Sequence, residues 1–182
     1  TPAVLIPRPE TEELVRWVAE AARGQHFLDV GTGSGCIAIS LKLRRPEATV
    51  CAWDISPEAI DVARKNAESL GTDVQFEVQD LFTAPPKPAA VVVSNPPYIC
   101  EKERVEMATH VVDFEPAQAL FVPDDDPLRY YKALAQLGAE EVFVEINAAL
   151  RQATADAFRA AGYQQIVCRK DEFGKDRFIY AC

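Results

Sequence analysis

One stretch of the sequence joins a short apolar run to an unusual set of hydrogen-bonding groups, Asn95-Pro96-Pro97-Tyr98. Residues 91–93 are β-branched and predict a buried strand, which must end at the prolines because they have no N–H to donate. Asn95 offers an amide donor and a carbonyl acceptor, while the two prolines offer only carbonyl acceptors. Acceptors beside the Tyr98 ring would suit a planar group bearing –NH₂, such as a carboxamide or an amino-base. A proline-terminated strand capped by Asn95 would explain these four residues equally well.

A glycine-rich turn provides the second candidate site. Residues 27–30 predict a strand, Gly31-Thr32-Gly33-Ser34-Gly35 follows, and residues 36–43 predict an apolar helix. This order is typical of nucleotide-binding units, because the turn lets a ligand approach the backbone. Cys36 stands where the dinucleotide fingerprint requires glycine, which favours a nucleoside over a pyrophosphate ligand. A tight connection between strand and helix is the alternative.

Two acids follow the next two predicted strands. Asp54 ends the strand predicted over residues 49–55, at the position where a ribose diol is held in nucleotide-binding folds. Asp80 follows the strand over residues 74–79 and could accept a hydrogen bond from an adenine amino group, with Leu81 or Phe82 covering the ring. The alternatives are a helix cap or solvated strand end for Asp54 and a turn residue for Asp80.

Strands and helices alternate along the chain, so the sequence predicts an α/β fold with a mostly parallel sheet and helices on both faces. Such a sheet would gather the glycine turn, Asp54, Asp80 and Asn95 at the carboxyl ends of its strands. A long loop is expected within residues 113–126, with Asp126 capping the next helix. The remaining predicted elements are helices 10–23, 57–70, 101–109, 128–137 and 151–161, a strand over residues 141–146, and a hairpin of residues 163–169 and 177–181.

Composition indicates a globular chain of one domain, residues 1–182, with 48% hydrophobic and 26% charged residues. The net charge of −9 opposes non-specific attraction to phosphate backbones. Five scattered cysteines without Cys-x-x-Cys spacing favour neither a metal site nor a disulfide framework, and fit a reducing cytoplasm. No membrane span or secretory signal is evident. Because the chain starts at Thr1 without methionine, we expect a fragment that lacks an upstream segment.

Several motifs together resemble the protein-(glutamine-N5) methyltransferases that modify peptide-chain release factors (the PrmC/HemK family), over nearly the whole chain. The lead-in motif is the most specific, since amino-methyltransferases acting on adenine or guanine share the asparagine-proline loop. The resemblance rests on Pro7-Arg8-Pro9-Glu10-Thr11-Glu12, Asp29-Val30-Gly31-Thr32-Gly33-Ser34-Gly35, Asn95-Pro96-Pro97-Tyr98, Phe114-Glu115-Pro116 and Gly174-Lys175-Asp176-Arg177.

The resemblance implies a class I S-adenosylmethionine-dependent methyltransferase fold, Rossmann-like, with a seven-stranded sheet and a C-terminal antiparallel hairpin. It implies methyl transfer to the glutamine amide in the Gly-Gly-Gln loop of class 1 release factors, with S-adenosylhomocysteine as the second product. The family's amino-terminal helical domain is not in this sequence. The implied cofactor-binding residues are Asp29, Gly31, Thr32, Gly33, Ser34, Gly35, Asp54, Ile55, Asp80, Leu81 and Asn95. The implied substrate-binding residues are Pro9, Glu10, Thr11, Asn95, Pro96, Pro97, Tyr98 and Glu115.

In the mechanism this suggests, Asn95, Pro96 and Tyr98 are catalytic: the Asn95 side chain and the Pro96 carbonyl accept the two N–H bonds of the target amide, and Tyr98 packs on its plane. The chemistry is positioning rather than deprotonation by a base. We expect a monomer with no metal and no direct contact to nucleic acid or membrane. An amino-methyltransferase for adenine or guanine of DNA or RNA, and a non-catalytic nucleotide-binding module, are the alternatives. The chain departs from the family pattern at Leu81, at Asp124-Asp125-Asp126 and at Asn147.

Overall fold

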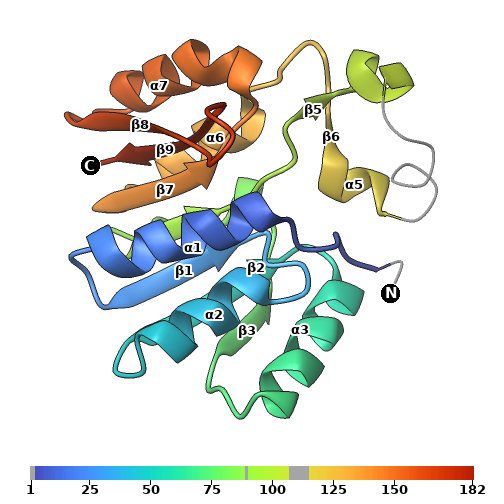
Figure 1. Cartoon of the computed structure of the whole chain (residues 1–182), viewed down its shortest axis with the longest axis vertical. Coiled ribbons are helices and arrows are strands. Elements are labelled where there is room, and N and C mark those ends of the chain that lie inside the picture. The colour runs from blue at the N-terminus through green and yellow to red at the C-terminus, as the bar shows by residue number, and fades with distance from the viewer. Residues whose placement is uncertain (1–2, 89, 107–114) are drawn as a thin grey trace.

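A seven-stranded sheet forms the centre of the computed structural model, which describes residues 3–88, 90–106 and 115–182 (Figure 1). Its strand order is β3-β2-β1-β4-β7-β9-β8, and β9 runs in the direction opposite to the other six strands. This agrees with the prediction of a mostly parallel sheet closed by a hairpin. The strands are β1 (His26–Val30), β2 (Thr49–Asp54), β3 (Gln75–Val78), β4 (Val91–Ser94), β7 (Glu141–Glu145), β8 (Ile166–Lys170) and β9 (Asp176–Ala181).

Helices cover both faces of the sheet. In Figure 1, α1 (Pro9–Ala21) and α2 (Cys36–Arg44) lie in front of the sheet, and α3 (Pro57–Ser69) continues this layer beside β2 and β3. The other face is covered by α6 (Arg129–Gln136) and α7 (Arg151–Ala160). No helix in the described ranges is long and apolar enough to cross a membrane.

Alternating side chains of β4 supply both cores, which is why three consecutive valines are needed there. Val91 and Val93 pack with α1 and α2, whereas Val92 packs with α6 and α7. On the α1 side, Trp17 meets the Phe143 ring edge-on at 5.3 Å between ring centroids. Burying such side chains contributes roughly 1.5–3 kcal/mol each, which stabilises the sheet that carries the strand ends.

Local sequence signals begin and end the helices that carry site residues. Pro9 is the first residue of α1, where its missing N–H costs nothing, and Glu10 lies in the first turn near the positive end of the dipole. The Ser56 hydroxyl caps α3 by accepting a hydrogen bond from the Ala59 N–H at 3.1 Å. Gly71 follows α3 with a φ of +62°, a conformation that glycine adopts without strain.

A small substructure beyond the carboxyl ends of the strands was not predicted. Two short strands, β5 (Ile99–Cys100) and β6 (Phe121–Val122), pair in parallel, and the short helix α5 (Ala117–Leu120) leads into β6 (Figure 1). Two-residue strands leave no periodic pattern, which explains why the sequence predicted a loop here. The 3₁₀ segments η1 (Leu81–Thr83), η2 (Glu101–Glu106) and η3 (Ala148–Leu150) complete the described elements.

Two of the predicted elements differ in detail from the structure. The predicted cap by Asp126 is wrong, because α6 begins at Arg129 after Leu128, and the Asp126 carboxylate pairs with Lys132 Nζ at 2.7 Å instead. The helix predicted over residues 101–109 is a 3₁₀ segment over its first six residues, and its end, like Asp113 and Phe114, lies outside the described residues.

Candidate active site

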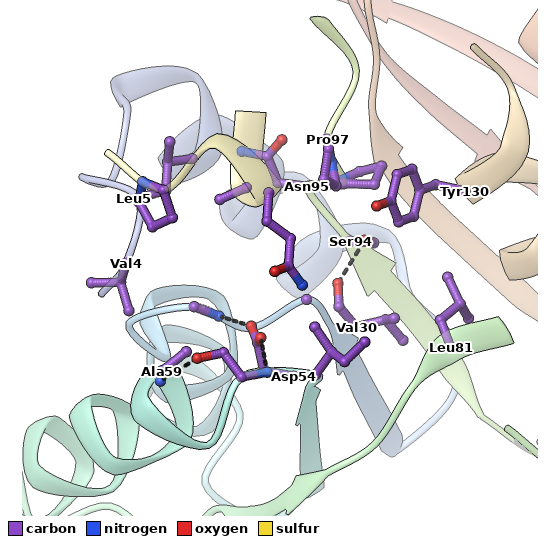
Figure 2. A pocket seen from close by; sticks show the side chains of 18 of the residues that line it. Val4, Leu5, Val30, Asp54, Ala59, Leu81, Ser94, Asn95, Pro97 and Tyr130 are labelled. Carbon is purple, nitrogen blue, oxygen red and sulfur yellow. Dashed lines mark hydrogen bonds between the residues drawn. The ribbon is translucent and has the colours of Figure 1, made fainter. Parts of the chain in front are cut away.

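A cavity of about 210 Å³ opens at the carboxyl ends of β1, β2 and β4, where parallel α/β sheets bind ligands (Figure 2). The labelled side chains come from far-apart segments and surround one hollow, with Val4 and Leu5 on one side, Asp54 and Ala59 below, and Asn95 and Pro97 above. The predicted site residues on its wall are Gly31, Gly33, Asp54, Ile55, Asp80, Leu81, Asn95, Pro96 and Pro97.

The glycine turn presents bare backbone to this cavity. Gly31 and Gly33 have φ values of +74° and +56°, and a Cβ built on either would meet nothing within 4 Å. The turn is tied down because the N–H groups of Gly31 and Thr32 both donate to the Trp53 carbonyl, at 2.8 and 2.9 Å. A side chain at either glycine would therefore occupy space that is open to a ligand.

Part of the predicted glycine-turn set lies behind the turn rather than on the cavity wall. Asp29 Oδ2 accepts hydrogen bonds from Thr32 Oγ1 at 2.6 Å and from the Ala38 N–H at 3.2 Å. Burial raises the pKa of Asp29 to about 7, and its Oδ1 has no partner in the described part of the chain. The Ser34 carbonyl accepts from Asn66 Nδ2 at 2.8 Å. These contacts hold the shape of the turn.

Asp54 connects the glycine turn to the start of α3. Its Oδ2 accepts from the Gly33 N–H at 2.9 Å, and its Oδ1 accepts from the Ser56 N–H at 3.0 Å (Figure 2). An ionised carboxylate has about four lone-pair sites, so both oxygens keep acceptor capacity on the cavity side. That capacity suits a vicinal diol, and half-exposed Ile55 lies next to it on the wall.

The far wall of the cavity carries two aromatic rings, those of Phe82 and Tyr130. Asp80 Oδ1 accepts from the Phe82 N–H at 2.9 Å and so caps η1. Asp80 and Leu81, the first residue of η1, both line the cavity. The Phe82 and Tyr130 rings lie 5.3 Å apart, and the Arg129 guanidinium lies 4.4 Å from the Phe82 centroid. Apolar surface beside an acceptor oxygen suits a planar base bearing an amino group.

Asn95 is held by a chain of hydrogen bonds that the sequence did not predict. Asn95 Nδ2 donates to Thr11 Oγ1 at 3.0 Å, and the Thr11 hydroxyl donates to Glu145 Oε2 at 3.0 Å. Glu145 Oε1 accepts from the Tyr98 hydroxyl at 2.8 Å. No hydrogen bond to Asn95 Oδ1 is found within the described ranges. One N–H of the Asn95 amide is thus engaged, and its carbonyl oxygen is left to act as an acceptor.

A second cavity, of about 330 Å³, adjoins the first. Leu5, Asn95, Pro96 and Ala119 line both cavities, so the asparagine-proline loop stands where they meet. The remaining lining residues of the second cavity are Arg8, Tyr98, Ile99 and Leu120. Tyr98 therefore lines the second cavity, and the target amide that it is predicted to pack against would have to lie in that cavity.

The lead-in motif frames this second cavity mainly through indirect contacts. Arg8 forms an ion pair with Glu115, with 2.6 Å between Nη2 and Oε1 and a Glu115 side chain only 3% exposed. Neither Glu115, Pro9, Glu10 nor Thr11 lines either cavity. Their contacts position the walls, because Arg8 links the lead-in to the segment before α5 and Thr11 links α1 to Asn95.

Asn147, one of the departures from the family pattern, supports the loop from below. Its Nδ2 donates to the Tyr98 carbonyl at 3.2 Å, and its Oδ1 caps η3 by accepting from the Ala149 N–H at 3.0 Å. Asp124, another departure, accepts from the Lys102 N–H at 3.2 Å. Both substitutions are therefore compatible with an ordered loop.

Sequence reasoning missed several residues of the site. Val4, Leu5 and Tyr130 gave no signal, because they come from a lead-in and a helix that chain order does not bring to the strand ends. Glu145 did give a signal, because it is an acid at the end of a predicted apolar strand. Burying a carboxylate there costs free energy unless it has a partner or a function. Glu145 is 1% exposed in the structure.

Comparison with known proteins agrees with this geometry. Residues 9–122 match the family model described as "Methyltransferase small domain". Among solved structures, the hMettl16 catalytic domain in complex with the MAT2A 3'UTR hairpin 6 aligns with a TM-score of 0.75 and 14% identity, covering 100% of this chain and 73% of that one. Magnesium protoporphyrin IX methyltransferase from Synechocystis, with bound SAH, aligns with a TM-score of 0.63 and 16% identity, covering 94% and 80%. The chain therefore has the class I S-adenosylmethionine-dependent methyltransferase fold.

Sequence relatives are more specific. Release factor glutamine methyltransferase from Bacteroides thetaiotaomicron is 48% identical, covering 99% of this chain and 68% of the relative. The proteins of the same name from Flavobacterium psychrophilum and Bacillus subtilis are 36% and 40% identical, covering 96% and 98% of this chain and 66% and 67% of the relatives. The chain belongs to the release factor glutamine methyltransferase family. It spans about two thirds of the length of these relatives.

Proposed function

We propose that this chain transfers a methyl group from S-adenosylmethionine to the side-chain amide nitrogen of the glutamine in the Gly-Gly-Gln loop of class 1 release factors. Family membership supports the reaction. The observation that carries the proposal is the position of Asn95 and Pro96 on the common wall of two cavities. A cofactor in the first cavity, which Gly31, Gly33 and Asp54 line, and a glutamine side chain in the second cavity would meet at these two acceptors.

The first cavity fits the cofactor by the chemistry of its walls. Gly31 and Gly33 leave room beside bare backbone for the methionine part, and Asp54 has acceptor capacity for the ribose diol. Asp80 and Leu81 lie where an adenine would be covered. S-adenosylmethionine supplies a methyl group on a positively charged sulfur. This methyl group is already electrophilic, so the protein does not need to activate it.

The difficulty of the reaction lies in the acceptor, because the lone pair of an amide nitrogen is delocalised into its carbonyl. Asn95 Oδ1 and the Pro96 carbonyl would accept the two N–H bonds and so fix the plane of the amide. Oriented acceptors of this kind act by positioning and by stabilising the charge that develops on nitrogen. Neither cavity is lined by a histidine, lysine or cysteine in the described chain, so the proton leaves after transfer, when the methylated nitrogen is acidic.

Replacing Asp54 with alanine tests the cofactor half of the proposal. The change removes the carboxylate that would hold the ribose and also releases the Gly33 N–H. We expect S-adenosylmethionine to bind about 10- to 100-fold more weakly, which corresponds to roughly 1–3 kcal/mol for charge-assisted hydrogen bonds. Isothermal titration measures this directly, and an unchanged dissociation constant would remove Asp54 from the cofactor site.

The substrate half is tested by offering three acceptors side by side with radiolabelled S-adenosylmethionine: a class 1 release factor, duplex DNA and RNA. We expect label on the release factor alone, because the net charge of −9 opposes binding to phosphate backbones. Label on adenine or guanine would establish the amino-methyltransferase alternative. Label on none of them, with the cofactor bound, would favour the non-catalytic module.

The proposal extends to the setting in which the enzyme works. We propose a cytoplasmic monomer that makes no direct contact with nucleic acid, and that recognises the release factor as a protein. Thiol chemistry supports the compartment, since Cys36, Cys51, Cys100, Cys168 and Cys182 are all free, as a reducing environment would leave them.

A further inference from the structure

We infer that Glu145, acting through Thr11, determines which atom of Asn95 faces the target, and that Thr11 and Glu145 are positioning residues for methyl transfer. The inference rests on the proposed function and goes beyond it. Thr11 is a buried residue of α1 and Glu145 is the buried last residue of β7, so the orientation of a loop residue is set by a helix and a strand of the core fold.

The direction of each hydrogen bond follows from the chemistry of the acceptor at the end of the chain. An ionised carboxylate only accepts, so the single hydroxyl proton of Thr11 must point at Glu145 Oε2. Thr11 Oγ1 can then only accept from Asn95, which requires the –NH₂ end of the amide to face Thr11. Asn95 Oδ1 is left toward the cavities as an acceptor. The opposite orientation would present a donor to a substrate N–H, and two donors repel.

Tyr98 makes the arrangement hard to reverse. Its hydroxyl donates to Glu145 Oε1 at 2.8 Å, so each carboxylate oxygen already has a donor. A neutral glutamine at position 145 has only one oxygen and would have to donate to one of the two hydroxyls. If it donated to Thr11, the Thr11 proton would turn to Asn95 and favour the flipped amide.

The charge state of Glu145 depends on groups from several elements. Burial raises its pKa, while donation from Tyr98 and Thr11 and the positive charge of Arg177 lower it and the charge of Glu10 raises it. Arg177 itself pairs with Asp171, with 3.1 Å between Nε and Oδ2. Tyr131 donates to the Glu145 backbone carbonyl, and Cys36 of α2 also lies within electrostatic range. The net effect is a pKa above the usual 4.5.

The sign of the pH dependence follows. Because the pKa is raised, Glu145 takes up its proton at a higher pH than an exposed glutamate would. A protonated carboxyl can donate, so the hydrogen-bond polarity is lost as the pH falls through this pKa. The transfer rate of the wild type should therefore fall on the acid side of its profile, with the carboxylate required for the active form.

Replacement of Thr11 by valine tests the relay, because valine keeps the shape and removes the hydroxyl. We expect kcat for methyl transfer to fall about 10- to 100-fold, with the dissociation constant of S-adenosylmethionine unchanged. Thr11→Ser should restore most of the rate, since it restores the relay. Thr154→Val is the matched control: this threonine is fully buried in α7 and its Oγ1 has no partner in the described chain, so its rate should stay at the wild-type value. Equal rates for Thr11→Val and the wild type would overturn the inference.

The pH profile of Glu145→Gln distinguishes a positioning role from a merely structural one. The variant should lose rate near neutral pH and should also lose the acid limb of the pH profile, because its side chain does not titrate. A profile that keeps the wild-type acid limb would overturn the role of Glu145.

An NMR measurement separates this inference from the proposed function. The side-chain ¹⁵N amide signals of Asn95, assigned by their loss in Asn95→Asp, should shift with pH in the wild type and stop shifting in Glu145→Gln. If no acceptor is methylated while these signals titrate as expected, the proposed function fails and the orientation of Asn95 by Glu145 stands. If the release factor is methylated while the signals ignore pH and the Thr11→Val rate is normal, only the positioning fails.

Discussion

Asn95→Ala should lower the rate of methyl transfer by at least about 100-fold while leaving cofactor binding nearly unchanged. The variant removes the Oδ1 acceptor but keeps the Pro96 carbonyl, the glycine turn and Asp54. The target amide would be held by one acceptor instead of two, so its nitrogen would no longer be aligned with the methyl group. Misalignment costs on the order of 100-fold, and a lost preorganised hydrogen bond about as much again. Single-turnover methylation with saturating cofactor measures this.

Asn95→Asp is the sharper control for the same residue. Aspartate keeps an acceptor of the same size, but it cannot donate to Thr11 Oγ1, whose only proton already goes to Glu145. It should retain more activity than alanine if acceptance from the substrate N–H is what matters. Wild-type transfer by Asn95→Ala would mean that the residue only ends a strand.

Gly35→Ala should destabilise the fold by about 2–5 kcal/mol. Gly35 has a φ of +82°, and a Cβ there would lie 3.0 Å from both Ala63 Cβ and Ile39 Cδ1 and 3.3 Å from Ala63 Cα. The left-handed backbone costs an alanine roughly 1–2 kcal/mol, and crowding against a well-packed helix costs roughly 1–3 kcal/mol more. Urea unfolding of the variant and the wild type measures the loss.

Gly138→Ala separates the two contributions. Gly138 also has a positive φ, +65°, but a Cβ there would meet nothing within 4 Å. It should therefore show the backbone cost alone, about 1–2 kcal/mol. If both variants lost the same free energy, close packing of the glycine turn on α3 would not be what requires glycine at position 35.

Much of the site could be predicted because parallel strands deliver their ends to one edge. Asp54 ends one predicted parallel strand and Asn95 follows another, which predicts that both lie at the same edge of the sheet, and in the structure these two strands pair on either side of β1. The glycine turn lies between them for the same reason. Features that depend only on nearby residues, such as the Ser56 cap and the start of α3 at Pro57, were also predicted and are confirmed.

What could not be predicted depends on contacts between distant segments. Thr11 and Glu145 are 134 residues apart, and nothing in either segment shows that a helix start and a strand end share a hydrogen bond. The sequence placed Thr11 among substrate-binding residues and gave Glu145 no role beyond a strand. In the structure Thr11 contacts Asn95 and lines neither cavity. The pairing of β5 with β6 could not be predicted either, since a strand of two residues shows no alternation of apolar and polar side chains.

The most direct test of the central claim is to locate the transferred methyl group. A class 1 release factor is incubated with this chain and S-adenosylmethionine that carries a deuterated methyl group, and its peptides are sequenced by tandem mass spectrometry. We predict one labelled methyl on the side-chain nitrogen of the Gly-Gly-Gln glutamine, and none when that glutamine is replaced by alanine. A label on another residue, or one that survives the alanine replacement, would contradict the assignment of the Asn95–Pro96 acceptors to a glutamine amide.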